Sequence, residues 1–202
     1  MTTGDPALLT KPALRHALRA ARRAHVEALD PRVHALVLNR PPAALLALIP
    51  PGAVIGLYVA GHGEAPAAGY ARHFHEAGHG VALPWFAARD QPMHFRRWAL
   101  PQLDELLVPG PFGVAQPAAD AAPVTPDVLF VPLVGFTADG ARLGQGGGHY
   151  DRWLAAHPAV PAIGLAWDCQ LVDSLPREAH DRMLAAVVTP TRLYGPYGAR
   201  DA

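Results

Sequence analysis

The residues with the clearest chemical potential lie in one glycine-rich run, RLGQGGGHYD, from Arg142 to Asp151. Its glycines permit positive φ angles and let the backbone approach a ligand closely. A helix is expected to begin near His149 and Tyr150, and a helix N-terminus offers unpaired N–H groups and a partial positive charge. The run lacks the Gly-Lys-Ser/Thr ending of a Walker A motif, and the last glycine of the dinucleotide fingerprint would fall at His149. It therefore predicts a phosphate-binding turn of another type, with a flexible connection as the alternative.

Charged residues beside the glycines favour the phosphate interpretation. Arg142 and Arg152 flank the run, and Asp151 falls in the first turn of the expected helix. A bare carboxylate beside a polyphosphate would be repelled unless a divalent cation bridged the two groups. Asp151 is therefore a candidate magnesium ligand. Alternatively, it interacts only with the helix dipole, which is worth about 0.3–1 kcal/mol.

Lys11 is the only lysine in the chain, whereas the other 16 of the 17 basic residues are arginine. Because arginine supplies the surface charge, this lysine is expected to have a specific role, with chance occurrence as the alternative. It opens a stretch of helical spacing that runs to about Leu29. Arg19, Arg22 and Arg23 on the same stretch are expected to form an ordinary solvated helix face.

The rest of the chain alternates between strand-like and helical patterns. Further helices are expected at Ala67–Ala77 and Tyr150–Ala156. Several apolar runs are continuous rather than alternating, which is typical of parallel strands covered on both faces. This order predicts a single α/β domain over residues 1–202, with a parallel sheet between layers of helices. The expected strands are Ala53–Val59, Gly80–Pro84, Val128–Phe136, Ala162–Trp167 and Ala185–Thr189.

Two segments need a separate interpretation. Pro41–Gly61 carries no charged residue and is long enough to span a bilayer, but Pro50-Pro51-Gly52 would break a helix at its middle. It is therefore predicted to form a helix over Ala43–Ile49, a turn and a buried strand. Val108–Asp127 contains five prolines and little periodicity. Such a segment is either a binding loop or lid, or a plain surface connection.

The composition excludes several classes of protein. Half of the 202 residues are hydrophobic and 17% are charged, which suits a globular core and argues against general disorder. The 17 basic residues balance 17 acidic ones, whereas a nonspecific nucleic-acid binder would carry a basic excess. The single cysteine, Cys169, cannot form an intramolecular disulfide and is expected to be a buried bystander. Met1–Lys11 lacks the apolar stretch of a secretion signal, so a cytoplasmic protein without a membrane partner is expected.

The segment from Pro132 to Leu154, PLVGFTADGARLGQGGGHYDRWL, resembles the signature of the 5-formyltetrahydrofolate cyclo-ligases, also called 5,10-methenyltetrahydrofolate synthetases. Further family elements follow the same order along nearly the whole chain. They are Lys11 with Arg15 (K-x-x-x-R), Tyr58–Glu64, Val81–Pro84, Phe112–Pro117, His180-Asp181 and Val187–Thr189. The chain departs from the family pattern at Thr137, where the family usually has aspartate, and at His149, where it usually has tyrosine.

The resemblance implies a three-layer fold with a mostly parallel sheet and helices on both faces, Rossmann-like and of the NagB/RpiA type. It also implies a reaction, the closure of 5-formyltetrahydrofolate to 5,10-methenyltetrahydrofolate with release of ADP and phosphate. ATP would be the co-substrate, magnesium the metal cofactor, and the formyl oxygen the phosphorylated atom. The expected partners are these two small molecules and no nucleic acid, and the expected working unit is a monomer.

The resemblance also assigns residues to roles. Lys11 and Arg142 would be catalytic, and Asp151 and Asp181 would bind magnesium. Trp85, Phe95 and Trp98 would either wall the pterin or belong to the core. The pterin-bearing substrate would contact Val59, Glu64 and Tyr150. ATP would contact Lys11, Arg15, Arg142, Leu143, Gly144, Gln145, Gly146, Gly147, Gly148, His149, Tyr150 and Asp151.

Two other functions are compatible with the residues. One is a different enzyme on the same scaffold, such as a sugar-phosphate isomerase, which would need no ATP. The other is a non-catalytic nucleotide- or folate-binding module. In that case the departures at Thr137 and His149 would account for the lack of catalysis.

Overall fold

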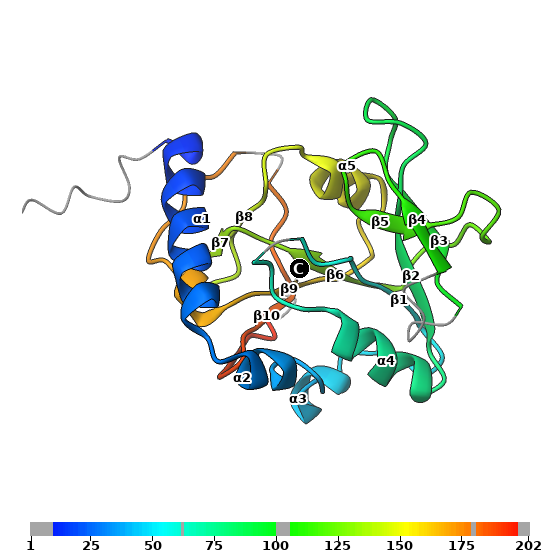
Figure 1. The fold of residues 1–202 in the computed structure, drawn as a ribbon, viewed down its shortest axis with the longest axis horizontal. Coiled ribbons are helices and arrows are strands. Elements are labelled where there is room, and N and C mark those ends of the chain that lie inside the picture. The colour runs from blue at the N-terminus through cyan, green and yellow to red at the C-terminus, as the bar shows by residue number, and fades with distance from the viewer. Residues whose placement is uncertain (1–9, 62, 100–105, 179–180, 198–202) are drawn as a thin grey trace, which may run out of the picture.

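A computed structural model describes residues 10–61, 63–99, 106–178 and 181–197 of the chain. Most of Met1–Lys11, the segment in which no secretion signal was expected, lies outside these residues. At its centre is a seven-stranded sheet with the strand order β11-β10-β9-β6-β1-β2-β3 (Figure 1). The five inner strands are parallel, whereas β3 and β11 run antiparallel at the two edges. The strands are β1 (Val54–Gly56), β2 (Gly80–Trp85), β3 (His94–Arg97), β6 (Val128–Pro132), β9 (Ala162–Leu165), β10 (Ala186–Val188) and β11 (Leu193–Tyr194).

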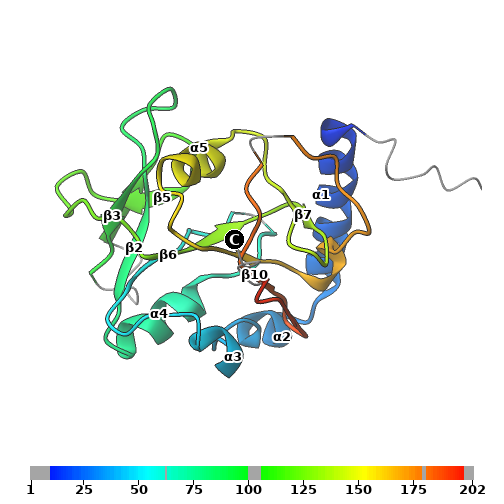
Figure 2. The same cartoon turned by 180° about the vertical axis from the view of Figure 1, so that it is seen from behind.

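Helices cover both faces of this sheet, as Figure 1 and the reverse view in Figure 2 show. One face carries α2 (Pro31–Leu36), α3 (Ala43–Leu46) and α4 (Ala68–Glu76), and the opposite face carries α5 (His149–Ala156). The long helix α1 (Lys11–Ala28) stands at one side, beside the short 3-10 turn Asp168–Gln170. The predicted three-layer α/β fold is therefore confirmed.

Strand β6 is apolar at every position because both of its faces are buried. Phe130 packs against Tyr70 and Phe74 of α4, in the core between the sheet and the helices α2–α4. Its neighbours Leu129 and Val131 belong to the second core, which also contains residues of α5. Successive side chains of a strand point to opposite faces, so a strand covered on both sides needs apolar residues at every position.

The predicted strand Val128–Phe136 is two elements, which corrects the prediction. Strand β6 ends at Pro132, and Gly135–Phe136 forms β7, which pairs antiparallel with β8 (Arg142–Leu143) in a separate hairpin. The Gln170 amide accounts for the break, because it donates to the carbonyls of Leu133 and Val134 at 2.7 and 3.0 Å. These carbonyls are thereby satisfied without a neighbouring strand.

The first departure from the family pattern, Thr137, lies in the hairpin turn. Thr137 is 3% exposed, and its hydroxyl oxygen accepts the N–H of Ala141 at 3.1 Å and donates to Asp139. Gly140, at the turn predicted at Asp139-Gly140, has φ of 92°. Thr137 therefore closes the β7–β8 turn, and its side chain is committed to the fold.

The two segments that needed interpretation are both structured. Pro41–Gly61 forms α3 and β1 around a turn at Gly52, as predicted, although α3 ends at Leu46. Within the described chain, we find no helix whose length and apolarity would let it cross a bilayer. Val108–Asp127 contributes to an antiparallel hairpin of β4 (Leu107–Pro109) and β5 (Ala115–Pro117). This hairpin was not predicted, because the prolines of the segment interrupt the strand pattern in the sequence.

Candidate active site

A cavity of about 540 Å³ lies where the parallel strands end. Tyr58 and Val59 follow β1, Pro84 lies near the end of β2 and Pro132 ends β6, and all four line it. Ligands of open α/β sheets gather at this edge, outside the carboxyl ends of the strands. Every predicted site residue also lines this cavity. They are Lys11, Arg15, Val59, Glu64, Arg142, Leu143, Gly144, Gln145, Gly146, Gly147, Gly148, His149, Tyr150, Asp151 and Asp181.

The glycine-rich turn joins the hairpin to α5. Gly146 and Gly148 have φ of 105° and 66°, values that residues with a Cβ rarely adopt. Gly148 is the N-cap residue of α5, so the turn delivers its backbone to the positive end of the helix dipole. The predicted position of this helix start, near His149, is confirmed.

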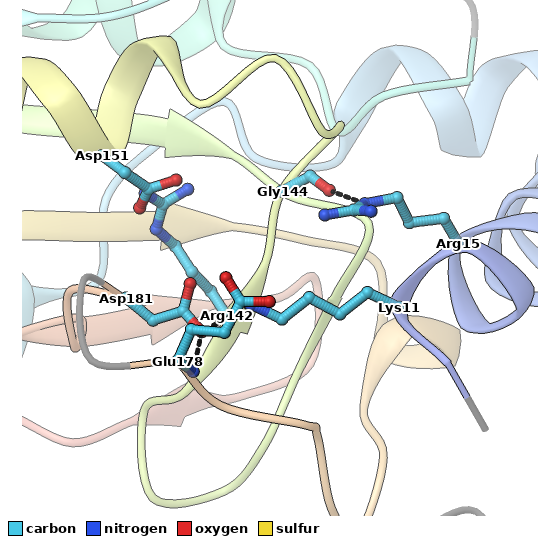
Figure 3. Close-up of polar contacts among 7 residues, drawn as sticks. All are labelled: Lys11, Arg15, Arg142, Gly144, Asp151, Glu178 and Asp181. Carbon is cyan, nitrogen blue, oxygen red and sulfur yellow. Dashed lines mark hydrogen bonds and ion pairs between the residues drawn. The ribbon is translucent and has the colours of Figure 1, made fainter. Parts of the chain in front are cut away.

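Helix α1 holds this turn from the side. The Arg15 Nε donates to the Gly144 carbonyl at 2.8 Å, as Figure 3 shows. One turn further along α1, Arg19 donates to the backbone and side-chain oxygens of Gln145, at 2.8 to 3.0 Å. The turn is therefore fixed to α1 by several hydrogen bonds.

Two cations in the wall of the cavity, Lys11 and Arg142, form ion pairs with carboxylates (Figure 3). The Lys11 Nζ is 2.8 Å from Asp181 and 3.3 Å from Glu178, and its side chain is 14% exposed. Arg142, whose side chain is 3% exposed, pairs with Asp151 across the glycine turn. The site thus combines cations and carboxylates from α1, β8, α5 and the segment that contains Glu178 and Asp181. His180, which precedes Asp181 in the C-terminal signature, lies outside the described residues.

The carboxylates fit a magnesium ion that arrives with a polyphosphate. Asp151 and Asp181 both line the cavity, and each already faces a cation. Over the described ranges, no group of three or more His, Cys, Asp or Glu side chains is placed to hold a metal. Magnesium keeps several waters and usually takes one or two protein carboxylates together with substrate phosphates. The donor set therefore suits that mode rather than a dedicated protein cage.

Glu64 lines the same cavity and is hydrogen-bonded to the glycine turn. Its Oε2 accepts the N–H of Gly61 and its Oε1 accepts the side-chain amide of Gln145, both at 2.8 Å. Burial raises the pKa of Tyr58 and of Tyr150, and the charge of Glu64 adds to both effects. Both phenols therefore stay protonated at neutral pH. Tyr58 was not among the predicted contacts, although its position beside Val59 is a signal for it.

The aromatic wall of the cavity does not contain Trp85, Phe95 or Trp98, which were expected either there or in the core. Phe86, Phe112 and His149 meet edge to face, with ring centroids 4.8 to 5.2 Å apart. Phe95 and Trp98 are buried core residues, 2% and 6% exposed, and Trp85 lines a different cavity. Burial, with a contribution from Arg152, lowers the pKa of His149, so its ring is neutral at pH 7.

Phe112 belongs to the proline-rich segment, whose hairpin tip forms one side of the cavity. The segment is therefore more than a surface connection.

The arginines of α1 correct another prediction, because they do not form a solvated face. Arg22 is 6% exposed, and burial lowers the pKa of its guanidinium while Glu64 opposes that change. Arg19 contacts Gln145, and only Arg23 of the three is exposed. Lys11, Arg15, Arg19 and Arg22 are spaced by four, four and three residues, which aligns them on one helix face. That spacing was the sequence signal for a basic stripe along one face of α1, of which Arg22 is the buried member.

Comparison with known proteins identifies the family of the chain. A sequence model described as the 5-formyltetrahydrofolate cyclo-ligase family matches residues 8–190. The 5-formyltetrahydrofolate cyclo-ligase of Escherichia coli K12 is 46% identical over 87 residues, which are 40% of this chain and 48% of that protein. The enzyme of the same name from Haemophilus influenzae is 43% identical over 76 residues, 35% of this chain and 41% of that protein. The aligned stretch thus spans about half or less of these curated relatives.

Solved structures show the same fold over nearly the whole chain. The 5,10-methenyltetrahydrofolate synthetase of Aquifex aeolicus superimposes with a TM-score of 0.62 at 23% identity, and covers 96% of this chain and 88% of that one. The synthetase of Mycoplasma pneumoniae gives a TM-score of 0.63 at 22% identity, with 89% and 98% covered. At this level of identity the likeness establishes the architecture.

Proposed function

Because the chain belongs to the 5-formyltetrahydrofolate cyclo-ligase family, we propose that it closes 5-formyltetrahydrofolate to 5,10-methenyltetrahydrofolate with ATP and magnesium. One observation carries this proposal. A single cavity combines a glycine turn at a helix N-terminus, two cation–carboxylate pairs and the separate carboxylate of Glu64. The first two features suit a triphosphate, and Glu64 suits the N–H donors of a pterin.

The chemistry requires activation of a poor leaving group. The N5-formyl oxygen attacks the γ-phosphorus of ATP, and ADP leaves. N10 then attacks the formyl carbon, the carbon–oxygen bond breaks to release phosphate, and the N10 proton is lost. Phosphoryl transfer asks the protein for positioning and charge neutralisation rather than for a covalent nucleophile.

The proposed roles follow the positions of the cations. Lys11 and Arg142 would neutralise charge on the transferring phosphoryl group, because both side chains are largely buried and line the cavity. Arg15 and the backbone of the glycine turn would bind the remaining phosphates. Asp151 and Asp181 would hold magnesium, which neutralises phosphate charge when it is bound. In the structure Asp151 pairs with Arg142 and Asp181 pairs with Lys11, so these four charged groups lie together in the wall of the cavity.

The folate would lie on the other side of the same cavity. Glu64 would accept hydrogen bonds from the pterin, while Val59 and the protonated Tyr150 would contact its ring. His149 stands where the family usually has tyrosine, and its neutral ring still packs against Phe86 and Phe112. These contacts support a functional site despite that departure.

The proposed working unit is a monomer with a single domain, acting in the cytoplasm. Every residue assigned to ATP, folate or magnesium lines one cavity of one chain. This shared cavity within one chain supports the proposed monomer.

The purified protein should convert 5-formyltetrahydrofolate to the methenyl product only when both ATP and magnesium are present. The absorbance of methenyltetrahydrofolate reports the product directly. Product formation without nucleotide would contradict the mechanism. A correctly folded protein that binds both ligands without turnover would instead be a binding module, and activity on sugar phosphates alone would favour an isomerase.

Replacing Glu64 with glutamine should weaken folate binding and leave ATP binding near wild type. The amide loses acceptor strength and gains a donor that faces the pterin N–H groups, at a cost of roughly 1–3 kcal/mol. The KM for folate should therefore rise about 5- to 150-fold. Steady-state kinetics with each substrate varied in turn measures this. Glu76→Gln, on the exposed end of α4, is the matched control, and equal weakening of both substrates would refute the assignment of Glu64.

A further inference from the structure

A second cavity of about 730 Å³ adjoins the first. Met93 and His149 line both cavities, so the two cavities are neighbours at these residues. Its remaining walls come mainly from β2, β3, α5 and the residues that precede β6. Apart from His149, no residue given a role in the proposed function above lines this second cavity.

The walls of the second cavity are aromatic and basic. The Arg96 guanidinium lies 4.2 Å from the centroid of the Trp85 ring, and Trp153 stacks on His157 with centroids 4.0 Å apart. Arg152 adds a second cation. Among the described residues, no aspartate or glutamate lines this cavity. A cavity with cations and no carboxylate favours an anionic ligand.

Arg96 has hydrogen-bonding capacity to spare. Its Nη1 donates to the Ala121 carbonyl, whereas its Nε is buried and has no hydrogen-bond partner within the described structure. A guanidinium offers five N–H donors, and a buried donor without a partner is costly. The Nε of Arg142 in the first cavity is also buried without a partner, but its Nη2 pairs with Asp151. Among the described residues, no carboxylate forms an ion pair with Arg96.

The folate substrate has the complementary shape. Its pteridine is joined through p-aminobenzoate to glutamate, so its two carboxylates lie at the end opposite the pteridine. If Glu64 binds the pteridine, those carboxylates need a cationic partner elsewhere. We propose that the second cavity binds the glutamate carboxylates of the folate, with Arg96 as their ionic partner. This assignment rests on the proposed function and deepens it.

The test compares two substrates: 5-formyltetrahydrofolate and 5-formyltetrahydropteroate, which lacks the glutamate. Arg96→Gln should raise the KM for the folate about 10- to 100-fold, because it removes a charge-assisted hydrogen bond. The KM values for the pteroate and for ATP should stay within about twofold of wild type. Arg97→Gln is the matched control, because Arg97 is the next residue of β3 and is exposed. It should match wild type with both substrates.

A second variant tests the cavity without changing Arg96. Thr125 is exposed and lines the second cavity. Thr125→Glu should repel the carboxylates and raise the KM for the folate alone. Three results would overturn the assignment: equal KM changes for both substrates, an increase in the KM for ATP, or no effect of either variant on an active enzyme. Wild-type protein inactive on both substrates would refute the proposed function itself, which separates the two failures.

Discussion

Lys11→Ala should lower the turnover of the cyclisation on the order of 10²–10³-fold, or about 3–4 kcal/mol, while the protein remains folded. The Lys11 side chain is 14% exposed and lies in the cavity wall, where its positive charge would stabilise the transferring phosphoryl group. The structure sets a limit on the accompanying loss of stability. Lys11 pairs with the partly exposed Asp181 and Glu178, and such pairs contribute about 1 kcal/mol or less. Single-turnover kinetics together with chemical denaturation would measure the two effects separately.

Lys11→Arg should recover only part of this loss, because a planar guanidinium is wider than an ammonium on a slim stem. Arg23→Ala is the control on the same helix, since Arg23 is exposed and lies off the basic stripe of α1. Normal turnover in all three variants would mean that α1 serves only as scaffold.

Asp151→Asn should reduce turnover by at least about 100-fold, or about 3 kcal/mol, and should raise the magnesium concentration needed for half-maximal rate. The amide is a weaker ligand for a hard cation than the carboxylate is. It also loses the ion pair with Arg142, whose side chain is 3% exposed, so some loss of stability is expected as well. Magnesium titrations of the variant and of wild type distinguish these effects.

Asp139→Asn is a matched control, because Asp139 also pairs with an arginine, Arg177, but both are exposed and neither lines the cavity. Its turnover and magnesium dependence should equal those of wild type. If Asp151→Asn lost turnover with an unchanged magnesium requirement, Asp151 would be a residue that positions Arg142 and not a metal ligand.

The sequence was most informative where one physical signal dominated. The continuous apolar runs at β1, β2, β6, β9 and β10 predicted the parallel strands, because a strand buried on both faces needs no polar residues. Short elements were missed, among them α2, β3 and the β4–β5 hairpin. Their stability comes from contacts with distant segments rather than from local periodicity, as the pairing of β3 with β2 shows.

In the candidate site, too, some features could be predicted from the sequence and others could not. The glycine turn was predicted from its composition, and the family resemblance supplied Glu64 and Asp181, which no local pattern identified. Which aromatic residue faces the cavity could not be predicted, because Trp85 and Phe86 are neighbours that lie in different cavities. The burial of Arg22 was also missed, since it depends on how α1 packs against residues more than a hundred positions away.

The contact between Lys11 and Asp181 joins residues 170 positions apart, and Arg15 meets Gly144 across 129 positions. Contacts of such long range are closed only after the intervening chain has collapsed, because their loop entropy must be overcome first. The part of the cavity wall that contains Lys11, Arg15, Gly144 and Asp181 is therefore expected to form late in folding, and it needs both ends of the described chain. During synthesis, a nascent chain that has not yet exposed Asp181 cannot complete this site, however well its first strands have paired. A nucleotide that binds only the completed cavity would favour the last step of folding and would oppose the separation of α1 from the sheet.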